Sequence, residues 1–179
     1  MGVVRKFWLV AASLVLSSTL ATAQGNAALH QTILKVTTAA VLGLNDPRPV
    51  TLTVSVPANG RSLLPGQKNE TRRLWYSFVN AVGTYRKITV RMSGFSPAGT
   101  SLSVEALNVM VGAGNASAGQ IVITDREKEI ITLIPSCATG RLENSGTTLR
   151  YSLNVHSPSS LEEGASSTVT VYYTLTDDG

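Results

Sequence analysis

Short runs in which apolar and polar residues strictly alternate constrain the fold of this chain more than any other feature. Successive side chains of a β-strand point to opposite faces, so each such run buries one face and exposes the other. Four runs match this pattern without interruption. They lie at residues 50–56, 101–106, 149–156 and 168–176.

Less regular runs add further strands to this pattern. Residues 32–42, 74–79, 86–93, 120–124 and 129–134 have strand composition, and clusters of Gly, Pro, Asn and Ser separate them. About nine short strands without a long helix predict an all-β fold, an antiparallel immunoglobulin-like (Ig-like) β-sandwich. No linker divides residues 24–179, so we expect one domain there. Residues 62–73 indicate an exposed connection and residues 111–119 a mobile loop.

The first 23 residues have the layout of a secretory signal peptide. Arg5 and Lys6 precede an apolar run that extends to about residue 20, and an A-x-A-type cleavage motif ends at Ala23, before Gln24. The run is short for a membrane span and has no basic flank behind it, although an uncleaved N-terminal anchor is the alternative. We therefore expect cleavage between Ala23 and Gln24 and a secreted, periplasmic or cell-surface location.

Composition excludes several classes of function for the mature chain of 156 residues. Because Arg5 and Lys6 belong to the predicted signal peptide, the mature chain has 13 basic and 11 acidic residues. There is no run dense in Lys or Arg, so we expect no nucleic-acid partner. No second apolar run reaches 18 residues, so we expect no membrane span after signal cleavage.

Cys137 is the only cysteine, so no intrachain disulfide can form even in an oxidising compartment. A single cysteine in an exported protein is either a buried, unreactive thiol or one half of an intermolecular disulfide. We favour burial, because a free cysteine behaves as a small apolar residue. Stability must therefore come from the core and the sheets.

The candidate chemical motifs are weak. Residues 94–98 nearly match the nucleophile elbow G-x-S-x-G, but Pro97 has no N–H for an oxyanion hole, which favours a plain turn. The only histidines, His30 and His156, do not form a zinc-ligand pattern with Cys137. The charges at residues 125–129 are typical of a solvated hairpin tip. We expect no catalytic residue, no metal and no cofactor, and thus no enzyme.

One candidate binding patch emerges from strand parity. If residues 72–80 and 85–93 form a hairpin whose apolar faces point into the core, Trp75 lies on the outer face beside Lys87 and Arg91. An exposed Trp flanked by cations can stack on a sugar ring or be buried by a partner protein. Alternatively, Trp75 is covered by a loop or packs between the sheets.

The C-terminal part of the chain resembles known protein modules. Residues 151–155, 161–164 and 168–171 resemble the last two strands of bacterial Ig-like surface modules, and residues 97–102 and 173–176 resemble parts of uncharacterised exported bacterial proteins of pilin-like or spore-coat-like type. Chaperone–usher pilins differ in having a disulfide pair. The resemblance implies a structural role at the surface and supplies no catalytic residues.

Together these observations predict an exported, non-catalytic structural or assembly protein of the bacterial cell surface. Its partners would be further copies of itself, other surface proteins or a glycan. The alternative is an extracellular binding module for a carbohydrate or a protein, with Trp75, Lys87 and Arg91 as its patch.

Signal cleavage is directly testable. The intact mass of the protein purified from its native host should correspond to a chain that begins at Gln24. A mass that retains residues 1–23 would contradict the prediction and favour the N-terminal anchor.

Overall fold

The computed structural model describes residues 40–54, 68–140, 142 and 145–178. The predicted signal peptide, its cleavage site at Ala23 and Gln24, and His30 lie outside the described residues. The chain from Ala40 to Gly179 clusters as one compact unit, which is the part considered below.

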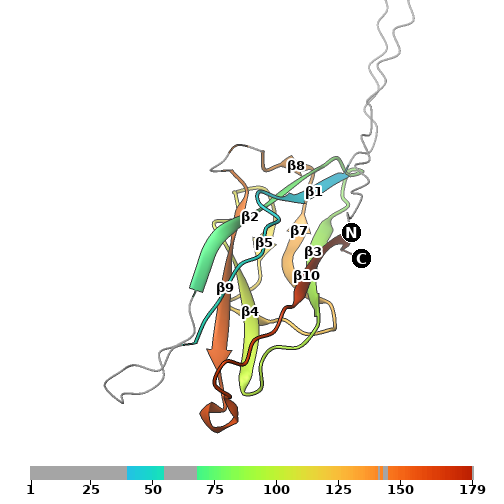
Figure 1. The fold of residues 1–179 in the computed structure, drawn as a ribbon. Helices are drawn as coiled ribbons and strands as arrows, with labels where there is room; N and C mark the ends of the chain where they lie inside the picture. The colour runs from blue at the N-terminus through green and yellow to red at the C-terminus, as the bar shows by residue number, and fades with distance from the viewer. Residues whose placement is uncertain (1–39, 55–67, 141, 143–144, 179) are drawn as a thin grey trace, which may run out of the picture. The chain divides into compact units, whose positions relative to one another are not determined.

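Two antiparallel sheets make up this unit (Figure 1), so the prediction of an all-β, antiparallel fold is confirmed. The first sheet has the order β1-β2-β9-β4-β6, with β8 also paired to β2; the strands are β1 (Ala40–Leu44), β2 (Lys68–Phe78), β9 (Thr147–Val155), β4 (Thr100–Leu107), β6 (Ile121–Val122) and β8 (Cys137–Ala138). The second has the order β10-β3-β7-β5; the strands are β10 (Thr170–Asp177), β3 (Arg86–Ser93), β7 (Lys128–Ile134) and β5 (Asn115–Ala116).

Alternating side chains from both sheets form one buried cluster, a β-sandwich-like arrangement. Leu74, Tyr76 and Phe78 come from β2 of the first sheet, and Ile88 and Val90 come from β3 of the second. Burying each such side chain contributes about 1.5–3 kcal/mol in transfer free energy. The hydroxyls of Tyr151 on β9 and Tyr173 on β10 also meet across the sheets at 2.7 Å.

The predicted hairpin of residues 72–80 and 85–93 is wrong. β2 pairs with β1, β8 and β9, whereas β3 pairs with β7 and β10, so the two strands lie in different sheets. Their apolar faces do point into one core, but from opposite layers. Residues 68–73, expected in an exposed connection, instead begin β2.

The predicted strand at residues 50–56 is only partly realised. Residues 50–54 alternate between exposed and partly buried as expected, yet they belong to no sheet; residues 55 and 56 lie outside the described part. The carbonyls of Arg48 and Pro49, just before this run, accept hydrogen bonds from the Arg72 side chain instead of from a neighbouring strand. Alternation predicts burial, whereas a strand also needs a partner backbone.

Residues 111–119, predicted as a mobile loop, contain a buried residue and the short strand β5. Ala113 is fully buried, and its carbonyl accepts a 2.8 Å hydrogen bond from the Tyr76 hydroxyl. A Cβ on Gly114 would lie 2.8 Å from the carbonyl oxygen of Thr132, so only glycine fits there. Small residues here permit close packing.

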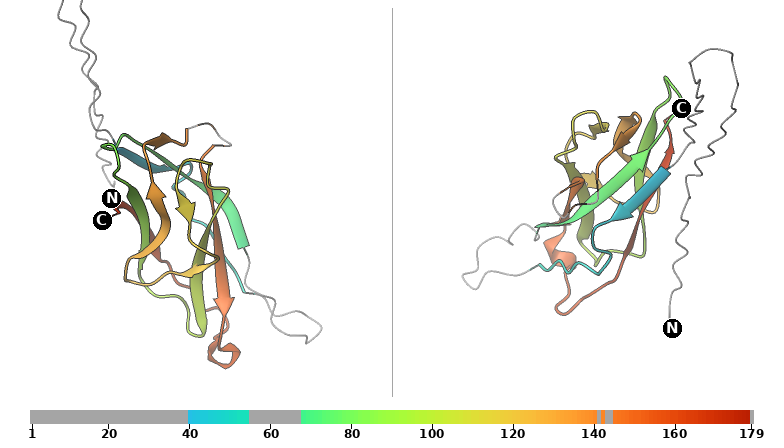
Figure 2. Two further views of the ribbon diagram at one scale, coloured as in Figure 1. Left: turned by 180° about the vertical axis from the view of Figure 1, so that it is seen from behind. Right: turned by 90° about the horizontal axis from the view of Figure 1, so that it is seen from above.

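Strand β10 is held at its C-terminal end by Asp178. The Asp178 carboxylate accepts the N–H of Leu133 at 2.7 Å, where β7 adopts a left-handed conformation (φ +50°). The Asp178 N–H donates to the carbonyl of Tyr85 at 3.1 Å. As Figure 2 shows in two further views, β1 and β10 stand at the ends of their sheets.

Candidate functional site

The predicted patch of Trp75, Lys87 and Arg91 is not formed as one surface. Lys87 and Arg91 share the outer face of β3, whereas Trp75 lies on β2 of the other sheet. The prediction placed them together only because it paired β2 with β3. The outward direction of Trp75 agrees with its parity, since Leu74 and Tyr76 on either side of it are buried.

Trp75 lies under the connection that precedes β9. Its indole Nε1–H donates a 3.0 Å hydrogen bond to the carbonyl of Ser145, and the side chain is only partly exposed. Gly146 packs against the ring so closely that a Cβ there would lie 2.5 Å from Trp75 Cδ1. This is the alternative in which a loop covers Trp75, and the geometry makes the side chain a packing group.

Tyr172 on β10 is an exposed aromatic group of the second sheet that the predicted patch did not include. The guanidinium carbon of Arg91 lies 4.4 Å from the centre of the Tyr172 ring, and Tyr172 is 41% exposed. Tyr172 and Arg91 face each other in the register of β10 and β3. Parity alone marks Tyr172 as outward; only the strand order shows that Arg91 is its neighbour.

Lys87 has acidic partners on the same face. Its Nζ lies 2.8 Å from a Glu129 carboxylate oxygen and 3.8 Å from one of Asp178. The hydrogen bond to Glu129 is the main cause that raises the pKa of Lys87 above its ordinary value. Lys87 is thus engaged within the fold, whereas Arg91 packs on the partly exposed ring of Tyr172.

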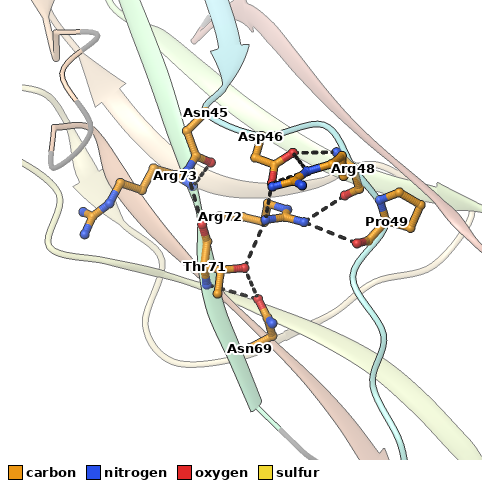
Figure 3. A network of polar contacts seen from close by, with 8 residues as sticks. All are labelled: Asn45, Asp46, Arg48, Pro49, Asn69, Thr71, Arg72 and Arg73. Atoms are coloured by element: carbon orange, nitrogen blue, oxygen red, sulfur yellow. Dashed lines mark hydrogen bonds and ion pairs between the residues drawn. The ribbon is translucent and has the colours of Figure 1, made fainter.

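A second polar cluster surrounds the buried side chain of Arg72 (Figure 3). Arg72 is 9% exposed, and its NH1 lies 3.2 Å from an Asp46 carboxylate oxygen and 3.1 Å from the Thr71 hydroxyl. Its NH2 donates to the carbonyls of Arg48 at 2.9 Å and Pro49 at 3.3 Å. The guanidinium is engaged by protein acceptors, so this cluster anchors the segment after β1 and leaves no evident place for a ligand.

Asp46 is shared by two arginines. Arg48 binds its carboxylate through NH2 at 2.9 Å and Nε at 3.1 Å, and Arg72 contacts it from the other side. Hydrogen bonds from the Arg48 side chain are the largest cause that lowers the pKa of Asp46 from 3.8 to about 2. Asp46 therefore stays ionised in all but strongly acidic solution.

The remaining sequence candidates lie apart from one another. Residues 94–98 form the turn between β3 and β4, as predicted, and His156 is exposed beyond the end of β9. Cys137 on β8 is partly buried against the core, and burial raises the pKa of its thiol. In the part of the chain that the structure describes, no group of three His, Cys, Asp or Glu side chains could hold a metal ion. No helix among these residues is long and apolar enough to cross a bilayer.

The edge of β10 that faces away from β3 is a candidate contact surface. Its eight residues pair with β3 in one continuous register, from Thr170 opposite Ser93 to Asp177 opposite Arg86. Among the described residues, no strand pairs with its other side. Exposed edges are usually protected by Lys, Pro or a β-bulge. Residues 168–176 (TVTVYYTLT) contain no charge, Pro or Gly, and the register with β3 shows no bulge.

No family model, curated protein or solved structure matches this chain.

The packing of Trp75 under Gly146 predicts a position-specific cost. Gly146→Ala should lower the free energy of unfolding by more than Gly83→Ala. Both glycines have a left-handed backbone (φ +88° and +79°), but a Cβ at Gly83 meets nothing within 4 Å. Chemical denaturation followed by fluorescence is suitable, because Trp75 is the only tryptophan after residue 23. Equal losses in the two variants would contradict this account of Trp75.

The lowered pKa of Asp46 predicts that the stability difference between Asp46→Asn and the unmodified protein depends on pH. Its folded pKa of about 2 lies below the ordinary 3.8, so its contribution is complete above pH 3.8 and is lost as the pH falls through about 2. Asp46→Asn should lower the melting temperature near neutral pH, and the gap to the unmodified protein should close toward pH 2. Asp125→Asn is the control, since Asp125 is exposed and forms no ion pair among the described residues. A gap that persists at pH 2 would contradict the ion-pair account.

Proposed function

We propose that this chain is an exported, non-catalytic structural or assembly protein of the bacterial cell surface, built on an Ig-like sandwich. The observation that carries the proposal is the edge of β10, which has no strand partner among the described residues. Apart from Asp177 at its end, β10 has no charge, Pro or bulge, so its edge presents a row of backbone N–H and C=O groups that another chain can pair with. Such pairing extends a sheet and assembles subunits without a dedicated pocket.

The core and the buried polar contacts of the described residues suit a rigid structural subunit. Apolar side chains of both sheets form one core, and Arg72 joins the segment after β1 to β2 through buried contacts. With a single cysteine the chain needs no intrachain disulfide for this core. The charged groups near the outer face of β3 are mainly engaged with one another, as Lys87 is with Glu129.

Arg91 and Tyr172 favour a second candidate function, an extracellular module that binds a carbohydrate or a protein. The exposed Tyr172 ring, stacked beneath a guanidinium, offers an apolar face with polar neighbours, which suits a sugar ring. This candidate replaces the patch based on Trp75. Glycan binding that Tyr172→Ala abolishes, without a change in association state, would favour it over assembly.

The assembly proposal predicts self-association or association with a surface partner through β10. The chain from Gln24 to Gly179 should form oligomers as its concentration rises from low micromolar to near millimolar in sedimentation velocity. Thr174→Lys should weaken this association, because an edge lysine disfavours strand pairing. Ser101→Lys is the matched control, since Ser101 lies on β4 and pairs there with Asn154 of β9. Association that both variants weaken equally would contradict a role for the β10 edge.

A further inference from the structure

We infer that the partner of the β10 edge is the β10 edge of a second copy of this chain, paired antiparallel about a two-fold axis at Tyr173. The inference rests on the proposed function and names its partner. Two four-stranded sheets would thereby join into one continuous sheet.

The first support is the self-complementarity of the strand. Centred on Tyr173, an antiparallel pair sets Tyr172 opposite Thr174, Val171 opposite Leu175 and Thr170 opposite Thr176 of the other copy. Apolar residues that face the core then meet apolar residues, and on the other face Tyr172 meets Thr174 and Thr170 meets Thr176, whose hydroxyl is buried without a hydrogen-bond partner in the described structure. Such aromatic, β-branched and Thr–Thr pairs each contribute about 0.2–1 kcal/mol relative to alanine pairs.

The second support is the distribution of charge along β10. Its only charged residue is Asp177, at the end of the strand, where the carboxylate lies 3.5 Å from Arg86 Nε. With the axis at Tyr173, each Asp177 falls beside residue 169 of the other copy, so the two carboxylates do not oppose each other. Like charges directly opposite would be destabilising, and this register avoids them.

The other strands that end a sheet order are poorer partners: β5 and β6 have two residues each, and β1 is the longest of the three. β1 has five residues, Ala40–Leu44, of which two are the small residues Ala40 and Gly43. It provides fewer backbone groups and fewer side-chain pairs than the eight residues of β10. Pairing of β1 with β10 would also be head-to-tail, which produces open chains unless the rotation closes. A two-fold pairing uses the same edge of both copies and leaves neither β10 exposed.

A charge exchange at two outward positions tests the pairing and its register. Tyr172→Lys combined with Thr174→Lys places like charges opposite each other twice across the axis. Tyr172→Glu combined with Thr174→Lys places opposite charges there. In sedimentation equilibrium of the chain from Gln24 to Gly179, we expect the first pair of changes to raise the dimer dissociation constant about tenfold or more. We expect the second pair to preserve or lower it.

The register is tested by the second variant alone. If the axis lay at Tyr172 or at Thr174, that residue would lie opposite the same residue of the other copy. Tyr172→Glu with Thr174→Lys would then place two like charges opposite each other. A dimer that this variant weakens would therefore overturn the Tyr173 register. Thermal unfolding of both variants at low concentration controls for the fold, because Arg91 lies beside position 172.

The outcomes separate the inference from the proposed function. Oligomers that neither variant changes, or that exceed a dimer through another surface, would overturn the two-fold pairing and leave assembly intact. A chain that remains monomeric at every concentration overturns the pairing. A monomer that still associates with a surface partner through the β10 edge would keep the proposed function.

Discussion

Buried polar groups on the inner face of β2 are the constraint on which the rest of the structure depends. Arg72 and Tyr76 both point inward; within β2 the Arg72 guanidinium has only the Thr71 hydroxyl as an acceptor, and the partners of the Tyr76 hydroxyl lie outside β2. Arg72 requires Asp46 and the carbonyls at 48 and 49, whereas Tyr76 requires the carbonyl of Ala113. Because an unpaired buried donor costs about 1–3 kcal/mol, these distant segments are fixed where they can pair with β2.

The two sheets differ in the pairing of the strands near their edges. β2 is paired by β1 on one side and by β9 and β8 on the other, and the segment after β1 is anchored by Arg72. β10 has pairing only toward β3 among the described residues, together with a fixed end at Asp178. The same strand therefore contributes Tyr173 to the core and an edge that no other described strand pairs with. Core packing and the proposed assembly thus depend on one strand.

Much of the fold could be predicted from alternation, whereas the neighbours of each strand could not. Parity correctly placed Leu74 and Ile88 in the core and Trp75 and Arg91 outside it. It could not show that β2 and β3 occupy different sheets, because sheet order depends on contacts that are remote in sequence. Contacts of Trp75 with Gly146 and of Arg91 with Tyr172 are of this kind, and no local pattern encodes them.

The pairing of β10 with β3 has a consequence for how the protein forms. Ser93 pairs with Thr170 and Arg86 with Asp177, separations of 77 and 91 residues along the chain. Closing such long loops is entropically costly and slows folding. Until residue 178 is available, β3 lacks one neighbour and Leu133 lacks its carboxylate partner. Under the proposed export from the N-terminus, this sheet order would delay folding until translocation is nearly finished and would keep the chain unfolded while it crosses the membrane.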